Sequence, residues 1–224
     1  MATHLDLEEQ EQLDQLKAFW KKYGNLITWV VIVVLGAYAA WNGWHLWQRN
    51  QAANAGAMYN ELEQAAQAGD AERTARIFGD LRERYPSTVY AEQGGLLAAK
   101  LQFDAGQPDK ARASLEWVAE KAGQPEYQAI ARLRLAGVLL DEKKYDAALK
   151  QIDAVGAKEF AALAADRRGD VLLAQGKKDE AKAAYQAAWK AMEPNVEYRR
   201  LVEAKLTALG AAPEIVATAG ESAK

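Results

Sequence analysis

The amino-acid sequence predicts an all-α fold in which a single N-terminal transmembrane helix is followed by a solenoid of α-hairpins. Three observations support this prediction. Residues 26–47 contain no Asp, Glu, Lys or Arg, so they can form a helix that spans a bilayer. The remaining sequence is rich in Ala, Leu, Glu, Lys, Gln and Arg, which are strong helix formers. Small residues recur in it at the period of two-helix repeats.

The composition favours one soluble domain and argues against several classes of function. The chain has 224 residues, which leaves one domain of ordinary size after the anchor. Its formal net charge is -3, without the positive stripe that nucleic-acid binding requires. It has no cysteine, and both histidines, His4 and His45, lie outside the soluble part. We therefore expect no catalytic residue, no metal site and no cofactor.

Residues 1–24 are predicted to form a cytoplasmic amphipathic lead-in. Apolar side chains recur in it at steps of three and four residues, the spacing of one helix face, at Leu13, Leu16, Trp20 and Tyr23. Such a helix either supports the membrane anchor or docks a soluble regulatory partner in the cytoplasm. The residues alone leave both interpretations open.

Residues 25–48 are predicted to be the transmembrane helix. The uncharged run would be about 33 Å long, enough to cross a hydrocarbon core of about 30 Å. Aromatic residues flank it, as is typical of the headgroup level, and Trp41, Trp44 and Trp47 lie at its far end. Lysines precede the span, whereas Arg49 alone follows it closely. The positive-inside rule then predicts a cytoplasmic N-terminus and a C-terminal domain on the other side of the membrane.

Two further features of this segment affect its interpretation. The sequence Ala37-Tyr38-Ala39 has the small-x-small form of a signal-peptidase site, but the long acidic lead-in and the tryptophans beyond it favour a retained anchor. Small residues share one helix face, where another transmembrane helix could pack closely or lipid could lie, namely Gly36, Ala40 and Gly43.

Residues 49–210 are predicted to form the hairpin domain. In three units a small residue precedes a second small residue by twelve positions, in the pairs Ala99/Ala111, Ala136/Ala148 and Gly169/Ala181. Apolar or small residues follow the second member at +4 and +7, as Leu115/Val118, Ile152/Val155 and Tyr185/Ala188. The small pair lets the two helices of a unit approach closely, and the following residues pack against the next unit.

Turn residues separate the predicted helices. They centre on Gly106, Lys143 and Gly176 in these three units. An earlier unit covers residues 55–86, with its turn at Gly69-Asp70 and its end at Pro86, because proline cannot continue a helix. A last helix over residues 196–209 would cover the edge of the stack, and residues 211–224 are predicted to be a disordered tail.

These units resemble the tetratricopeptide repeat, since their spacing lies close to the typical 34 residues. In such a solenoid the first helices line the concave groove. Exposed polar positions on them are candidates for partner binding, although each could simply be solvated: Gln102, Arg132, Arg134, Arg167 and Arg168.

Taken as a whole, the chain resembles the YfgM-like ancillary subunits of the SecYEG translocon. The most specific parts are the lead-in ending EQLDQLKAFWKKYG, the span closed by tryptophans, and the run LAADRRGDVLLAQGKKDEAKAAYQAAW. The resemblance implies an inner-membrane protein with a periplasmic tetratricopeptide-like domain. It also implies association with SecYEG and with a membrane-anchored periplasmic chaperone of the parvulin type, in support of secreted proteins.

Two other functions compete with this scaffold role. One is a regulatory anchor whose cytoplasmic segment binds a soluble signalling partner. The other is a carboxylate-dependent periplasmic enzyme, for which the adjacent acids Asp141-Glu142 and Asp179-Glu180 are the candidates. Both pairs are expected in charged turns, without the apolar surroundings that raise the pKa of a general acid.

Overall fold

The structure, a computed structural model, describes residues 7–213, with side chains from residue 11 onward. The described residues form helices and no strand. In chain order the elements are α1 (Leu7–Gln67), α2 (Ala71–Arg84), α3 (Val89–Asp104), α4 (Pro108–Lys121), α5 (Pro125–Asp141), α6 (Tyr145–Asp153), the 3-10 helix η1 (Lys158–Phe160), α7 (Ala161–Ala174), α8 (Lys178–Ala191) and α9 (Tyr198–Ala208). They belong to two compact units, residues 1–51 and residues 52–224.

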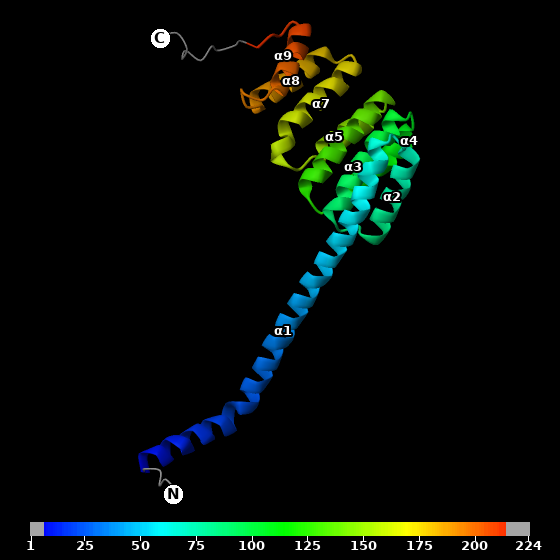
Figure 1. The fold of residues 1–224 in the computed structure, drawn as a ribbon. Helices are drawn as coiled ribbons and strands as arrows, with labels where there is room; N and C mark the ends of the chain where they lie inside the picture. The colour runs from blue at the N-terminus through cyan, green and yellow to red at the C-terminus, as the bar shows by residue number, and fades with distance from the viewer. Residues whose placement is uncertain (1–6, 214–224) are drawn as a thin grey trace, which may run out of the picture. The chain divides into compact units, whose positions relative to one another are not determined.

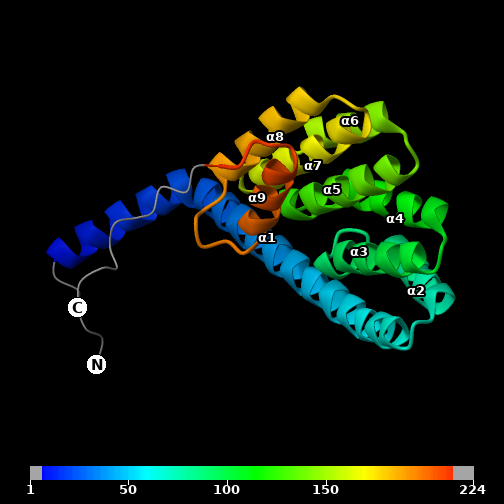
Figure 2. The same cartoon turned by 90° about the horizontal axis from the view of Figure 1, so that it is seen from above.

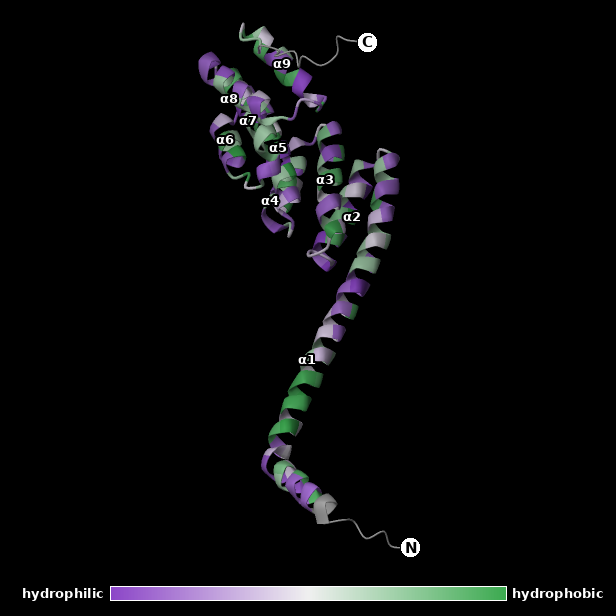
Figure 3. Ribbon diagram, turned by 90° about the vertical axis from the view of Figure 1, so that its left-hand side faces the viewer, coloured by the Kyte–Doolittle hydropathy of each residue, from purple (hydrophilic) through white to green (hydrophobic). Residues whose placement is uncertain are grey.

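The first unit is formed by the part of α1 before Ala52, which holds the lead-in and the apolar span, whereas residues 52–67 of α1 are the first helix of the first hairpin in the second unit (Figure 1). The sequence predicted the lead-in and the span as separate segments. They are continuous because the first proline of the chain is Pro86, so nothing interrupts the helical hydrogen bonds before the turn at Gly69. Within the described residues, α1 is the one helix long and apolar enough to cross a membrane, and Figure 3 shows its apolar stretch in green.

In its blue N-terminal part, α1 changes direction (Figure 1). Two local features favour bending there. Gly24 lacks a Cβ, and the Trp20 ring covers the space that a Cβ would take. The Thr28 hydroxyl donates a hydrogen bond of 2.8 Å to the Gly24 carbonyl oxygen, and threonine bonds to the residue four positions earlier are associated with bent helices.

The second unit is a stack of hairpins that runs from the end of α1 to α9 (Figure 2). The predicted turns are confirmed. Gly106 and Gly176 have φ values of 72° and 81°, in the left-handed region that glycine enters without steric cost. The middle hairpin has no glycine at this position, and Lys143 adopts a φ of 59° instead. The same turn geometry therefore forms in all three units.

The small residues of the repeats are buried where the two helices of each hairpin meet. The alanines at these positions are at most 2% exposed: Ala99, Ala111, Ala136, Ala148 and Ala181. At Gly169 the contact is closer, because a Cβ there would lie 2.4 Å from the Tyr185 ring. One detail of the prediction is wrong. Helix α6 ends at Asp153, so Val155 lies beyond it and does not share a helix face with Ile152.

Three apolar clusters form the core of the stack. The first joins the end of α1 to α2 and α3, the second joins α3 to α7, and the third joins α7, α8 and α9. Val202 and Leu206 bury the inner face of α9, which closes the final edge as predicted. Of the predicted tail, residues 211–213 are irregular and residues 214–224 lie outside the described residues, as does the start of the lead-in.

Candidate partner-binding groove

A groove of about 430 Å³ crosses the first helices of three successive hairpins. Helix α5 contacts both α3 and α7, as expected for first helices in a solenoid. All three helices contribute side chains to the groove, and α4 contributes one from beneath. The lining residues are Ala99, Lys100, Phe103, Asp104, Leu115, Arg134, Gly137, Val138, Asp141 and Arg167.

The groove is lined by both apolar and charged residues. Phe103 is 41% exposed, an unusual position for a phenylalanine. Among the charged side chains, Lys100 pairs with Asp104 at 2.5 Å, and Arg134 donates to the Leu96 carbonyl oxygen at 3.2 Å. With three cationic and two anionic side chains, the lining carries one formal positive charge. Such a surface can hold an apolar anchor beside an acidic group of a partner chain.

The structure brings Arg134 and Arg167, two of the predicted partner-binding residues, to this groove. The Arg167 guanidinium also donates to Asp170 at 3.4 Å, which holds it along α7. Beneath it, Gly137 leaves space, since a Cβ there would first meet the Arg167 guanidinium at 3.8 Å. These contacts orient both arginines. Partner binding by Arg134 and Arg167 stays a prediction.

The predicted exposure of Gln102 is wrong. The residue is 4% exposed, and its side-chain oxygen accepts a hydrogen bond of 2.8 Å from the Ser114 hydroxyl on α4. Gln102 is adjacent to the exposed Phe103 in sequence, but successive helix residues differ in direction by about 100°. It therefore fastens α3 to α4 and does not line the groove.

Arg132 and Arg168 do not reach the groove either. Arg132 donates to the Ala119 carbonyl oxygen on α4 and to Gln151 on α6. Arg168 forms an ion pair with Asp153 at the end of α6. All three partners lie on second helices, so these arginines connect first helices to second helices.

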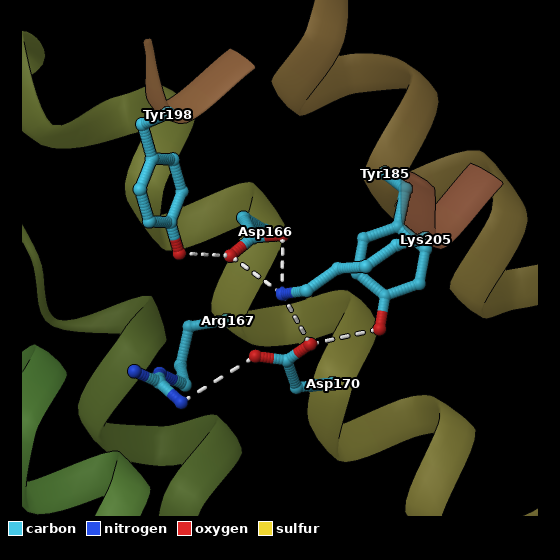
Figure 4. A network of polar contacts seen from close by, with 6 residues as sticks. All are labelled: Asp166, Arg167, Asp170, Tyr185, Tyr198 and Lys205. Carbon is cyan, nitrogen blue, oxygen red and sulfur yellow. Dashed lines mark hydrogen bonds and ion pairs between the residues drawn. The ribbon is translucent and has the colours of Figure 1, made fainter. Parts of the chain in front are cut away.

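A partly buried network of polar side chains beside the groove was not predicted (Figure 4). Asp166 on α7 is 1% exposed. It accepts a hydrogen bond of 2.7 Å from the Tyr198 hydroxyl and bonds of 2.8 and 2.9 Å from the Lys205 ammonium. Lys205 also donates to Asp170 at 2.7 Å. Two residues of α9 thus hold two carboxylates of α7, so the network fastens the last helix to the stack.

The tyrosines of this network are kept protonated by their surroundings. Burial raises the pKa of Tyr185, and its hydrogen bond to Asp170 at 2.8 Å raises it further. Burial and the bond to Asp166 raise the pKa of Tyr198 in the same way. A phenol that stays neutral remains a hydrogen-bond donor, so both carboxylates keep these partners even at alkaline pH, where an ordinary tyrosine would lose its proton.

The acids considered for catalysis lie at helix ends. Asp141 is exposed as the last residue of α5, while Glu142 pairs with Lys144 at 2.7 Å. Asp179 and Glu180 are exposed in the first turn of α8. Asp141 does line the groove together with Arg134 and Arg167, but it is exposed to solvent and is not enclosed in an apolar pocket.

The transmembrane face of Gly36, Ala40 and Gly43 is open in the first unit. A Cβ at Gly36 or Gly43 would meet no atom within 4 Å. This surface is therefore available to a neighbouring helix or to lipid, and the choice between them stays a prediction.

Sequence hints of the groove were limited. Phe103 follows Ala99 by one helical turn, and Val138 follows Arg134 by the same step. Residues at this spacing share one helix face, so these two pairs could have been predicted to line one surface. The Asp166 network had no such signal, because its members are separated by up to 39 residues.

Comparison with known proteins places these features in context. The profile of the family described as tetratricopeptide repeat-like domain matches residues 17–211. The ancillary SecYEG translocon subunit of Neisseria gonorrhoeae is 35% identical, over 93% of this chain and 100% of that protein. The protein of the same name from Escherichia coli is 30% identical, over 81% of this chain and 87% of its own length. The Haemophilus influenzae protein is 29% identical over a similar share.

Proposed function

Since the chain belongs to the family of ancillary SecYEG translocon subunits, we propose that it is a membrane-anchored scaffold that associates with SecYEG and assists secreted proteins. Its second partner would be a membrane-anchored periplasmic chaperone of the parvulin type. The relatives' names describe a translocon subunit and not an enzyme family.

The observation that carries this proposal is the groove of α3, α5 and α7. It presents Phe103 between charged side chains, on helices that the buried small residues hold in a regular stack. Partner binding by residues of this kind uses an aromatic anchor with a polar rim. A segment of the chaperone or of SecYEG with an apolar residue next to an acid would match Phe103 and the two arginines.

Anchoring would come from the apolar part of α1, proposed to span the inner membrane over residues 25–48. The side chains of this stretch are exposed, from Trp29 to Trp47, as a lipid-facing helix requires. Lysines on one side orient the N-terminus towards the cytoplasm, which puts residues 49–210 in the periplasm. That side is where emerging secreted chains and periplasmic chaperones meet.

Site-specific photocrosslinking in the full chain, in its native membrane, tests the groove. A photoreactive amino acid at Phe103 is expected to form adducts with SecYEG subunits or the periplasmic chaperone. The matched control is Glu120, which is exposed on α4 away from the groove. Equal adducts from both positions, or none from Phe103, would contradict partner binding in the groove.

A second pair of probes separates the groove from the membrane span. Gly36 lies on the small-residue face of α1, and Tyr38 lies on the opposite side of the same helix turn. Adducts from Gly36 alone would mean that the translocon is contacted through the span. Adducts from neither the groove nor the span would contradict the association itself.

A further inference from the structure

We propose that residues 11–23 of α1 lie along the cytoplasmic membrane surface as an interfacial helix that binds anionic phospholipid headgroups. This inference rests on the membrane anchoring proposed above. It assigns a ligand to the lead-in segment, which the scaffold function leaves without a role.

The segment has one continuous apolar face. At about 100° per residue, its five large apolar side chains fall within an arc of about 120°. All five are exposed, with Leu16 and Trp20 at 62% and 59%, together with Leu13, Phe19 and Tyr23. A face of this width would be costly in water and suits the boundary between headgroups and acyl chains.

Basic side chains border the apolar face. Lys17 and Lys21 lie along one edge, where they and the apolar side chains of Leu16 and Trp20 line a shallow hollow of about 560 Å³. Lys22 lies on the other side, with its ammonium 5.2 Å from the centre of the Tyr23 ring. An ammonium beside an apolar hollow can bind a lipid phosphate while the hollow receives the adjoining carbons.

The opposite face is polar and suited to water. It carries Glu11, Asp14 and the small Ala18, and Asp14 forms an exposed ion pair of 3.3 Å with Lys17. Lys17 is the central residue of the segment and Lys21 and Lys22 lie in its half nearer the span, whereas these two acids lie in the farther half. The positive charge is therefore concentrated where the chain meets the membrane surface.

Continuity with the span favours lipid over a protein partner. Tyr23 directly precedes Gly24, where α1 has the features that favour a bend, and Figures 1 and 3 show the change of direction. A bent helix can leave the bilayer and continue along its surface. The apolar face is then held at the headgroup level by the span itself, and its Trp, Tyr and Lys composition is typical of that level.

The natural absence of cysteine makes spin-label depth measurement direct. We suggest the full chain reconstituted in vesicles that contain about one third anionic phospholipid, with single labels at Leu16→Cys and Ala18→Cys. Nitroxide accessibility to oxygen and to a water-soluble nickel chelate reports depth. The Leu16 label is expected in the headgroup and upper acyl region, and the Ala18 label, on the opposite face of the same turn, in water.

The possible results separate this inference from the proposed anchoring. A label at Ile32→Cys is expected deep in the bilayer, and an aqueous Ile32 label would contradict the anchor. If the Ile32 label is immersed but the Leu16 label is in water, the interfacial helix is contradicted. The same holds if added cytosolic protein then covers the Leu16 label, because the apolar face would bind protein and not lipid. Immersion of both Leu16 and Ala18 would also overturn it, since the segment would then belong to the span.

The lipid charge is tested with the triple variant Lys17→Gln, Lys21→Gln, Lys22→Gln. Removing each lysine is expected to weaken surface association roughly fivefold, so the Leu16 label should shift towards water. Replacing the anionic lipid by a zwitterionic one should have the same effect. The control variant, Lys177→Gln, Lys178→Gln, Lys190→Gln, removes equal charge from the second unit and should leave the label depth unchanged. No shift in the first variant would overturn headgroup binding.

Discussion

Asp166 is almost completely buried, although the charged sequence around it is typical of a solvent-exposed helix. Its two oxygens are occupied by Tyr198 and Lys205, both on α9. A buried charge is tolerated when hydrogen bonds and an opposite charge surround it, and its removal leaves the partners unpaired. The residue therefore helps to hold the last helix on the stack, together with the buried Val202 and Leu206.

Asp166→Asn is expected to loosen α9. The amide keeps the size of the side chain but loses the charge that holds the Lys205 ammonium, at a cost of about 2 kcal/mol. Hydrogen exchange of the α9 amides in the full chain, measured in detergent micelles, should become roughly 30-fold faster. Asp179→Asn is the control, because the Asp179 side chain is fully exposed. Unchanged exchange in α9 would show that the network is dispensable.

The raised pKa values of Tyr185 and Tyr198 predict a loss of stability at alkaline pH. In the unfolded chain a tyrosine titrates near pH 10, while in the folded protein the protons are held to higher pH. Stability from this source is complete below about pH 10 and falls above it, as the unfolded state releases protons first. The variant Tyr185→Phe, Tyr198→Phe should show a shallower decline of the thermal midpoint above that pH. An identical decline in both proteins would contradict the assignment.

The close approach between helices depends on glycine and other small residues at the contact points. Gly169 on α7 lies directly under the Tyr185 ring of α8, and Gly95 on α3 makes a similarly close contact with Val118 and Phe78. In the middle hairpin, Ala136 occupies the position equivalent to Gly169. The hairpins thus share one design but differ in how near their helices come.

Gly169→Ala is expected to destabilise the α7–α8 hairpin. The new methyl group would lie 2.4 Å from the Tyr185 ring, and overpacking of this kind costs about 1–3 kcal/mol, offset by up to about 1 kcal/mol of helix propensity. Gly137→Ala is the matched control on α5, where the nearest atom is 3.8 Å away. Urea unfolding followed by circular dichroism should shift to lower urea only for Gly169→Ala. Equal shifts of the urea midpoint in the two variants would mean that helix propensity alone determines the change in stability.

At the scale of the whole molecule, function depends on which side of the membrane each unit occupies. The apolar stretch of α1 separates the lysine-bearing lead-in from the hairpin domain along the chain. If that stretch spans the bilayer, the two units face different compartments, and a scaffold for emerging secreted chains must present its groove outside the cytoplasm.

Cysteine accessibility tests this topology. Ser87 is exposed between α2 and α3, and Ala18 is exposed in the lead-in. A membrane-impermeant maleimide added to intact spheroplasts should label Ser87→Cys, but should label Ala18→Cys only after permeabilisation. The reverse pattern would invert the orientation. Labelling of both in intact spheroplasts would argue against a spanning α1.

Some residues of the groove could be predicted from the sequence and others could not. Arg134 and Arg167 could be placed on groove-lining helices because the repeat period assigns each first helix to one face. Gln102 and Arg132 could not be placed correctly in the same way. Each lies on the correct helix but points towards a second helix, and the exact rotation of a helix is set by side-chain packing that the repeat pattern does not specify.

The kind and order of the elements could be predicted from the amino-acid sequence: an apolar helix, then hairpins closed by glycine-containing or lysine-containing turns. These features follow from periodicity, turn chemistry and apolar length, which are local properties of the chain. The packing of the helices shows which side chains share a surface, such as Phe103 with Arg134 and Arg167, and which carboxylates are buried. Those outcomes depend on contacts between residues far apart in sequence, whose geometry exists only after the helices have packed.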